Sequence, residues 1–333
     1  MTDVFGNYVI QKVLQYGTPE QRKLVLHTMQ GQIVNLSLGT YGCRVVQKAL
    51  EVLELEDQII VAEELRGFVH ACVKDQNANH VIQKVIETTA AAVANGAGGD
   101  PECVDFIPLS FRGQVLPLAA HCYSCRVLQR IFEHGTESQK RPLLDELLSA
   151  SQRLMQDQYG NYVVQWVLQQ GSPSDRLDVI RKTKGNILQL SRHKFASNVV
   201  EEIIRASEGL DRVELIEEIL TPDASATTLL PTPVVLMMKD QYANYVLQRF
   251  LEVAEGEQFV RLATMIQPQL ANMRRYSSGM SKHLSAIERI LAERGVSVGV
   301  TPMSPAAGNG AAVTAPTPTP APAASAVVSL AAA

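Results

Sequence analysis

Apolar residues recur along this chain in one helical pattern that is repeated seven times. Each copy begins with a short polar residue, here called position i, and has apolar residues at i+2, i+3, i+6 and i+7, such as Val9, Ile10, Val13 and Leu14. At about 100° per residue these positions cover roughly 200–340° of a helix, which is typical of one buried face. Positions i, i+1 and i+4 fall at roughly 0°, 100° and 40°, so we expect them to share the exposed face.

The spacing of the copies predicts a repeat array. Their first residues are Asn7, Cys43, Asn79, Cys125, Asn161, Ser197 and Asn244, which gives steps of 36, 36, 46, 36, 36 and 47 residues. Equal steps with two longer ones are typical of an array with two insertions. The inserted segments 88–101 and 221–233 are rich in Ala, Gly, Thr and Pro, so we expect loops there.

Each unit is predicted to contain three helices, because further helical patterns lie between the copies, for example at 31–38 and 56–65. One unit cannot bury its apolar face alone, whereas stacked neighbours can. We therefore expect an all-α protein, a curved right-handed α-solenoid of about seven three-helix repeats, with a C-terminal cap at 252–292. The chain starts a few residues before an inner helix, so at least one preceding repeat is also expected.

Composition adds limits to this picture. Residues 295–333 carry no charge and include the low-complexity run TAPTPTPAPAAS, so we expect a domain at 1–292 and a disordered tail at 293–333. The net charge of −4 argues against a general polyanion-coating protein but leaves room for a local basic stripe. Five cysteines in 333 residues do not make a disulfide scaffold, which favours a reducing compartment, the cytoplasm. No apolar run has the length of a membrane helix.

Positions i, i+1 and i+4 form seven polar triads with restricted chemistry. They are Asn7/Tyr8/Gln11, Cys43/Arg44/Gln47, Asn79/His80/Gln83, Cys125/Arg126/Gln129, Asn161/Tyr162/Gln165, Ser197/Asn198/Glu201 and Asn244/Tyr245/Gln248. The middle member is planar in every unit, and stacking of a base on such a plane contributes about 1–3 kcal/mol. The outer members suit hydrogen bonds to a base edge. Positions that merely face water would vary more freely.

These triads resemble those of the Pumilio (PUF) family of RNA-binding domains, in which each helical repeat reads one base. The resemblance covers residues 1–292. In the family, NY..Q and NH..Q units recognise uracil, CR..Q units adenine and SN..E units guanine, and the C-terminal repeat takes the 5′ base. Carried over unit by unit, the resemblance implies the site 5′-UGUAUAU. The order of the triads matches the last seven of the family's usual eight repeats.

Base chemistry agrees with these assignments. Guanine offers the donors N1–H and N2–H, and the carboxylate of Glu201 can accept both. Uracil offers one donor beside acceptors, which an Asn with a Gln can match. Adenine offers an acceptor at N1 and a donor at N6, which Gln can match while the thiol of Cys43 or Cys125 makes an apolar contact.

The resemblance implies a regulator without enzymatic activity or cofactors. It implies binding to mRNA 3′ untranslated regions, translational repression and mRNA decay, with a deadenylase complex and co-repressor proteins as partners. Co-repressors would meet the loop at 221–236, and a monomer is expected. Two alternatives remain open: an α-solenoid scaffold for peptides, which needs no such triads, and a ribosome-biogenesis relative with loose RNA specificity.

Two further features carry candidate chemistry. Position i+5 is basic in five of seven units, which suits contacts to phosphates or simply solvated charges; these residues are Lys12, Lys48, Lys84, Arg130 and Arg249. His121, Cys122 and Cys125 form an HCxxC motif, but no second pair with metal-ligand spacing accompanies it. We therefore expect no metal site.

Overall fold

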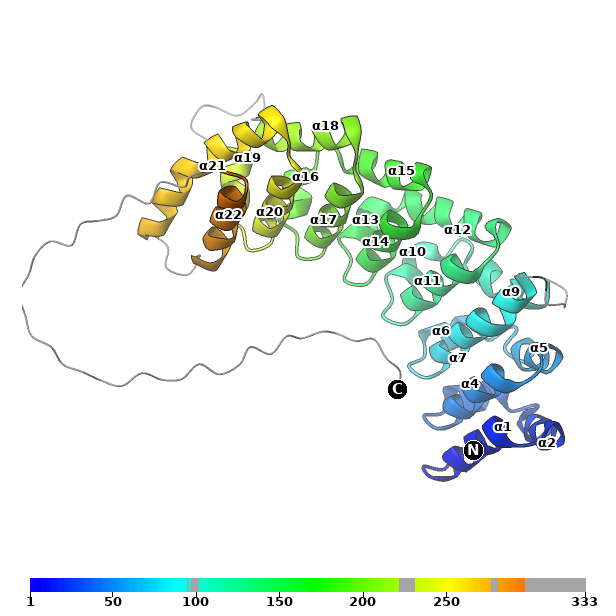
Figure 1. Ribbon diagram of the computed structural model, residues 1–333. Helices are drawn as coiled ribbons and strands as arrows, with labels where there is room; N and C mark the ends of the chain where they lie inside the picture. The colour runs from blue at the N-terminus through cyan, green and yellow to red at the C-terminus, as the bar shows by residue number, and fades with distance from the viewer. Residues whose placement is uncertain (95, 97–101, 222–230, 277–280, 297–333) are drawn as a thin grey trace, which may run out of the picture. The chain divides into compact units, whose positions relative to one another are not determined.

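The computed structural model describes residues 1–94, 96, 102–221, 231–276 and 281–296, and within them every regular element is a helix. Helices of successive units stack side by side (Figure 1). The predicted all-α solenoid is therefore confirmed. Contacts divide the chain into Met1–Val298 and Gly299–Ala333, and the predicted tail lies outside the described residues from 297 onward.

Seven helices that carry the triads form the inner row. They are α1 (Gly6–Tyr16), α4 (Gly42–Val52), α7 (Ala78–Val85), α11 (Ser124–His134), α14 (Gly160–Gln170), α17 (Ala196–Ala206) and α20 (Ala243–Val253). Each contacts the next one along the chain. Helix α22 (Ser281–Glu293) packs against α20 at the C-terminal end, as predicted for a cap.

The other helices complete the units. The outer row consists of α2 (Pro19–Met29), α5 (Leu55–Glu63), α9 (Glu102–Phe111), α12 (Glu137–Ser149), α15 (Pro173–Thr183), α18 (Gly209–Leu220) and α21 (Gly256–Tyr276). Short connecting helices lead back to the inner row: α3 (Ile33–Leu38), α6 (Val69–Lys74), α10 (Val115–Ala119), α13 (Ser151–Met155), α16 (Ile187–Ser191) and α19 (Pro233–Lys239). The predicted three helices per unit are present.

The first insertion differs from the sequence expectation. Helix α7 continues directly into a π-helical turn, η1 (Ile86–Ala90), and then into α8 (Ala91–Ala94). The loop predicted at 88–101 is thus helical up to residue 94, because the alanines that suggested low complexity also favour helix. Residues 95 and 97–101, and most of the second insertion at 222–230, lie outside the described residues.

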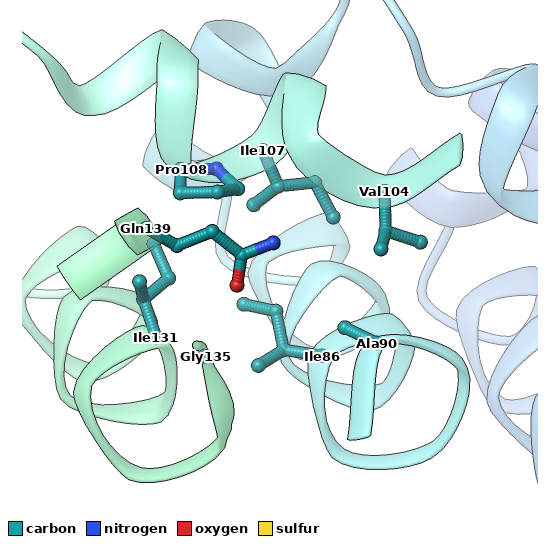
Figure 2. A pocket seen from close by; sticks show the side chains of 8 residues that line it. All are labelled: Ile86, Ala90, Val104, Ile107, Pro108, Ile131, Gly135 and Gln139. Atoms are coloured by element: carbon teal, nitrogen blue, oxygen red, sulfur yellow. The ribbon is translucent and has the colours of Figure 1, made fainter. Parts of the chain in front are cut away.

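A small apolar pocket lies where this insertion meets the fourth unit (Figure 2). Its lining consists of Ile86, Ala90, Val104, Ile107, Pro108, Ile131, Gly135 and Gln139. The polar end of Gln139 is engaged, since its Oε1 accepts from the backbone N–H of Thr136 at 2.8 Å and its Nε2 donates to Asp105. The pocket therefore belongs to the packing of the array.

Half-buried glutamates of three outer helices fix, by hydrogen bonds, the turns that lead into three of the connecting helices. Glu218 on α18 accepts from the backbone N–H groups of Gly185 and Ile187, both at 2.8 Å. Gly185 has φ +82°, a conformation that strongly favours glycine. Glu64 and Glu146 make the same paired contacts to Gly31 and Ile33 and to Gly113 and Val115. These contacts join the outer helices α5, α12 and α18 to the turns before α3, α10 and α16.

Candidate nucleic-acid interface

The first member of every triad is buried, contrary to the expectation that all three members share the exposed face. Its relative exposure is 5% or less in all seven units: Asn7, Cys43, Asn79, Cys125, Asn161, Ser197 and Asn244. The angular argument failed here because a neighbouring inner helix and the preceding turn cover this edge of the helix. In each asparagine unit the side-chain N–H groups donate to backbone carbonyls of the preceding turn. Asn79 Nδ2, for example, donates to the carbonyls of Asp75 and Gln76 at 2.8 and 3.0 Å.

The second member is the one that reaches solvent. Tyr8, Tyr162 and Tyr245 are 65%, 57% and 50% exposed, although tyrosine usually buries much of its ring. Arg44, Arg126 and Asn198 are also exposed, and His80 is half-buried. A planar side chain in the middle position of each unit therefore lies at the surface of the inner row, as the sequence predicted.

The third member is half-buried and held in a fixed position. In the four asparagine units, the Gln Nε2 at i+4 donates to the Asn Oδ1 at i: the distances are 2.9 Å for Gln11, Gln83 and Gln165 and 3.2 Å for Gln248. The turn thus orients the asparagine, and the asparagine orients the glutamine. This leaves the glutamine Oε1 as an acceptor and one N–H as a donor, the pair that sequence reasoning required for uracil.

The two cysteine units hold their glutamines differently. Cys43 Sγ and Cys125 Sγ lie 3.3 and 3.7 Å from the carbonyls of Thr40 and Cys122. Gln47 Nε2 donates to the carbonyl of Cys43 at 3.1 Å, and Gln129 Nε2 donates to the carbonyl of Tyr162 in the next unit at 3.2 Å. Burial raises the pKa of the Cys125 thiol to about 11, so the side chain is a neutral, largely apolar contact at neutral pH.

The sixth unit carries the only acidic third member among the seven triads, Glu201. Its carboxylate is half-buried, and this burial raises its pKa above the usual value, while Arg205 and Arg249 oppose the shift. Arg205 and Arg249 place a guanidinium nitrogen 3.5 and 3.7 Å from Glu201 Oε2. The sixth unit therefore offers a carboxyl group where the other six units offer an amide.

His80 is the proposed stacking residue of the third unit, and Arg44 and Arg126 occupy the same position in the second and fourth units. Burial lowers the pKa of His80, and the charges of Arg44 and Arg126 lower it further. The imidazole is therefore neutral at physiological pH, with one donor and one acceptor nitrogen. This favours a stacking role over a charged one.

The basic residues at i+5 lie in a network of carboxylates that the sequence analysis missed. Lys48 pairs with Glu51 at 2.5 Å, and Lys84 pairs with both Glu51 at 3.3 Å and Glu87 at 3.0 Å. Arg130 continues the series to Glu87 at 3.4 Å and to Glu133, and Arg249 pairs with Glu252. Lys12 instead lies over the ring of Tyr16, 5.0 Å from its centroid. The sequence feature that could have predicted this network is the acidic residue at i+8 in the units of Lys48, Lys84, Arg130 and Arg249.

Another recurrent residue that sequence reasoning missed stands at i−4. Asp75 and Asp157 each accept from two backbone N–H groups at the start of the following inner helix, all at 2.8 Å. His121 Nδ1 does the same for Tyr123 and Ser124 at 3.3 and 3.5 Å. His121 of the HCxxC motif is thus a helix cap. Among the described residues, no group of three or more His, Cys, Asp or Glu side chains is arranged to hold a metal ion.

Fold and site together define the class of the protein: an α-solenoid whose repeats present one planar side chain each beside a fixed hydrogen-bonding group. A model described as "Pumilio-family RNA binding repeat" matches the chain seven times, at residues 1–27, 32–66, 69–90, 114–148, 152–182, 186–220 and 233–266. The chain therefore belongs to the Pumilio (PUF) family of RNA-binding proteins. The resemblance inferred from the triads is confirmed.

Individual relatives agree with this assignment. Pumilio homolog 1 of Xenopus laevis is 43% identical over 300 residues, which is 90% of this chain and 24% of the relative. Pumilio homolog 12 of Arabidopsis thaliana is 29% identical over 292 residues, 86% of this chain and 46% of the relative. The chain thus spans less than half the length of these relatives.

Solved structures of RNA complexes share the fold. The Puf3 RNA binding domain bound to Cox17 RNA 3′ UTR recognition sequence site B is 38% identical with a TM-score of 0.75, covering 88% of this chain and 82% of that one. PUF-8 in complex with PBE-RNA is 31% identical with a TM-score of 0.76, covering 87% and 81%. Within the described residues, no helix combines the length and hydrophobicity of a membrane span.

Proposed function

We propose that this protein binds single-stranded RNA in a sequence-specific manner, with one base per inner helix and the preferred site 5′-UGUAUAU. The observation that carries the proposal is the row of seven planar side chains, six exposed and one (His80) half-buried, each beside a half-buried amide or carboxylate at i+4. Bases would interleave with the planar groups, and the i+4 side chains would select among them.

Selection would follow the hydrogen-bonding state of the i+4 group. In the four asparagine units, the bond from Gln Nε2 to Asn Oδ1 leaves a donor and an acceptor for uracil. In the sixth unit, Glu201 would accept from both guanine donors. In the cysteine units, a small neutral thiol beside Gln47 or Gln129 would make room for adenine. The buried residues at position i would act partly through the i+4 group that they orient.

Phosphate contacts are proposed for Lys12, Lys48, Lys84, Arg130 and Arg249. Four of these residues have carboxylate partners, so a phosphate would share or replace an existing ion pair. In a salt titration, the double variant K48A/K84A should show a shallower dependence of log Kd on log salt than the parent. An identical slope would assign these lysines to the carboxylate network alone.

The same proposal extends to cellular function. Bound to UGUA elements in mRNA 3′ untranslated regions, the protein would act in the cytoplasm as a monomeric, non-catalytic repressor that promotes mRNA decay by recruiting deadenylase and co-repressor proteins. The related Puf3 RNA binding domain supports the RNA target, since it is bound to a Cox17 RNA 3′ UTR recognition sequence.

An unbiased selection tests the proposed site. A randomised RNA pool would be enriched on the purified 333-residue protein over several rounds and then sequenced. The proposal expects a motif that begins with UGUA and continues with A/U bases. Enrichment of an unrelated motif, or recovery of a pool without any motif, would refute the assignment of bases to units.

A further inference from the structure

The inner helix of the sixth unit reverses a charge order that the other charged units share. Where both positions are charged, the basic residue stands at i+5 and the acidic residue at i+8: Lys48/Glu51, Lys84/Glu87, Arg130/Glu133 and Arg249/Glu252. In α17 the acid, Glu202, stands at i+5 and the base, Arg205, at i+8. The two still form an i,i+3 ion pair, so the pair itself does not require the reversal.

The reversal places an arginine one helical turn after the only acidic i+4 residue of the seven triads. Arg205 Nη2 lies 3.5 Å from Glu201 Oε2, while its Nη1 pairs with Glu202. With the usual order, an acid at i+8 would stand there instead, and like charges at i,i+4 destabilise a helix. The local charge order is therefore matched to the presence of Glu201.

The next inner helix makes a matching change of partner. Lys84 and Arg130, both at i+5, reach back to the i+8 acids of the preceding units, Glu51 and Glu87. Arg249 of α20 occupies the same position, but the acid it would meet is replaced by Arg205. Its Nη2 lies 3.7 Å from Glu201 Oε2, and its Nη1 pairs with Glu252. Two guanidinium groups from two helices thus converge on one carboxylate oxygen.

From this geometry we infer that Arg205 and Arg249 are positioning residues that set the specificity for guanine at the second base. They hold Glu201 Oε2 from two sides and favour its charged form, so that the carboxylate is oriented and ionised when the N1–H and N2–H donors arrive. The inference rests on the proposed function, because it deepens the assignment of guanine to the sixth unit. Neither arginine needs to touch the base.

The charged groups that act on Glu201 lie on two helices, α17 and α20. On α17 they are Arg205, which attracts the carboxylate, and Glu202, which repels it; on α20 they are Arg249 and Glu252, with the same two signs. A half-buried carboxylate with no compensating cation would bind a proton more readily. Removing either arginine should therefore weaken the guanine contact and make it more sensitive to acid.

The experiment compares binding of 5′-UGUAUAU and 5′-UUUAUAU by fluorescence anisotropy, using the full chain. In the variant E202R/R205E the local ion pair and the net charge are kept, but the acid returns to i+8. We expect the preference for G over U at the second base to fall by about tenfold. R249Q should act in the same direction, and R249K should recover part of the preference, since a lysine keeps the charge but not the planar fork.

The matched control is the same swap in an outer-row i,i+3 pair, E137K/K140E, whose two residues are joined at 2.8 Å. This swap should leave the G-over-U preference unchanged. Thermal melting of each variant, followed by circular dichroism, verifies that the array is folded. As pH is lowered, the preference should fade at a higher pH in R249Q than in the parent, a change that a purely structural role would not produce.

A double-mutant cycle separates the outcomes. In the E201Q background, R249Q should no longer change the base preference. If R249Q weakens both oligonucleotides equally in both backgrounds, Arg249 acts as a phosphate contact alone and the inference is overturned. If the parent prefers G and E201Q abolishes that preference while both arginine variants retain it, only this inference fails. If the parent shows no preference for G, the assignment of the sixth unit fails, and the inference fails with it.

Discussion

At the scale of single residues, each triad assigns stacking and base selection to different side chains. The planar group at i+1 is exposed in every unit but the third, where His80 is half-buried; the selecting group at i+4 is half-buried, and the residue at i is buried and bonded to the preceding turn. A group that is held before the ligand arrives loses less conformational freedom on binding. The triads therefore combine a preorganised hydrogen-bonding site with an accessible stacking surface.

Cys125→Asn should convert the fourth unit from adenine to uracil selection. The asparagine amide is expected to donate to the carbonyls of the preceding turn and to accept from Gln129 Nε2, as in the four natural asparagine units. Exchange of A for U at the fourth base should then cost less than in the parent by about 1–3 kcal/mol. Binding of the two oligonucleotides, measured side by side, tests this, and an unchanged preference for A contradicts it.

The pH dependence of guanine selection follows from Glu201. Burial raises the pKa of this carboxyl, and guanine binds the ionised form, so protonation competes with the base. The G-over-U preference should be full near neutral pH and fade on acidification, beginning at a higher pH than for an ordinary glutamate. Ratios of Kd at about pH 7.5 and about pH 5 measure this. The E201Q protein is the control, whose ratio should stay flat, and a flat ratio in the parent would contradict the account.

At the scale of elements, the helices follow from apolar spacing, because burial of a periodic stripe is the main stabilising term for each of them. Residues 31–38 and 56–65 are examples, since α3 and α5 lie there. The helical continuation through η1 and α8 could not be predicted in this way, because its alanines at 90–94 fit a loop and a helix equally well. Nor could the burial of position i, which depends on the neighbouring unit and on the turn capped by residues such as Asp75 and His121.

Glu218→Ala should destabilise the array where α18 contacts the turn before α16. The substitution removes both acceptors of the backbone N–H groups of Gly185 and Ile187, each bonded at 2.8 Å. We expect a loss of about 1–3 kcal/mol, seen as a lower urea midpoint. Glu293→Ala is the control, because its ion pair with Arg289 at 3.8 Å is exposed on both sides and should contribute about 0–1 kcal/mol. Equal midpoints for the two variants would show that the paired contacts are unimportant.

At the scale of the whole molecule, the stability of the array is a sum of units and of the interfaces between them. Position i+2 is fully buried in the second to seventh units, from Val45 to Val246, but Val9 of the first unit is 62% exposed. Helix α1 therefore contacts an inner-row neighbour on one side only among the described residues, namely α4. Repetition also explains why the triads could be found from the sequence, since positions that only face water would not keep the same restricted chemistry in seven copies.

Amide hydrogen exchange should reveal this gradient. Backbone amides of α1 should exchange markedly faster than the equivalent amides of α14, which has inner-row neighbours on both sides. The reason is that local opening of α1 breaks fewer buried contacts than opening of α14. Mass spectrometry of peptic peptides from the free protein gives both rates in one experiment. Equal protection in the two helices would show that the array unfolds as a single cooperative block.

The central claim is that each inner helix of this chain selects one base, and the most direct test is the affinity for an intact and a scrambled core. Binding of 5′-UGUAUAU would be compared with binding of the same bases in which the order of the first four is permuted. The account predicts that permutation weakens binding by at least about 100-fold, since several mismatches would each cost about 1–3 kcal/mol. Equal affinity for the two RNAs would contradict it.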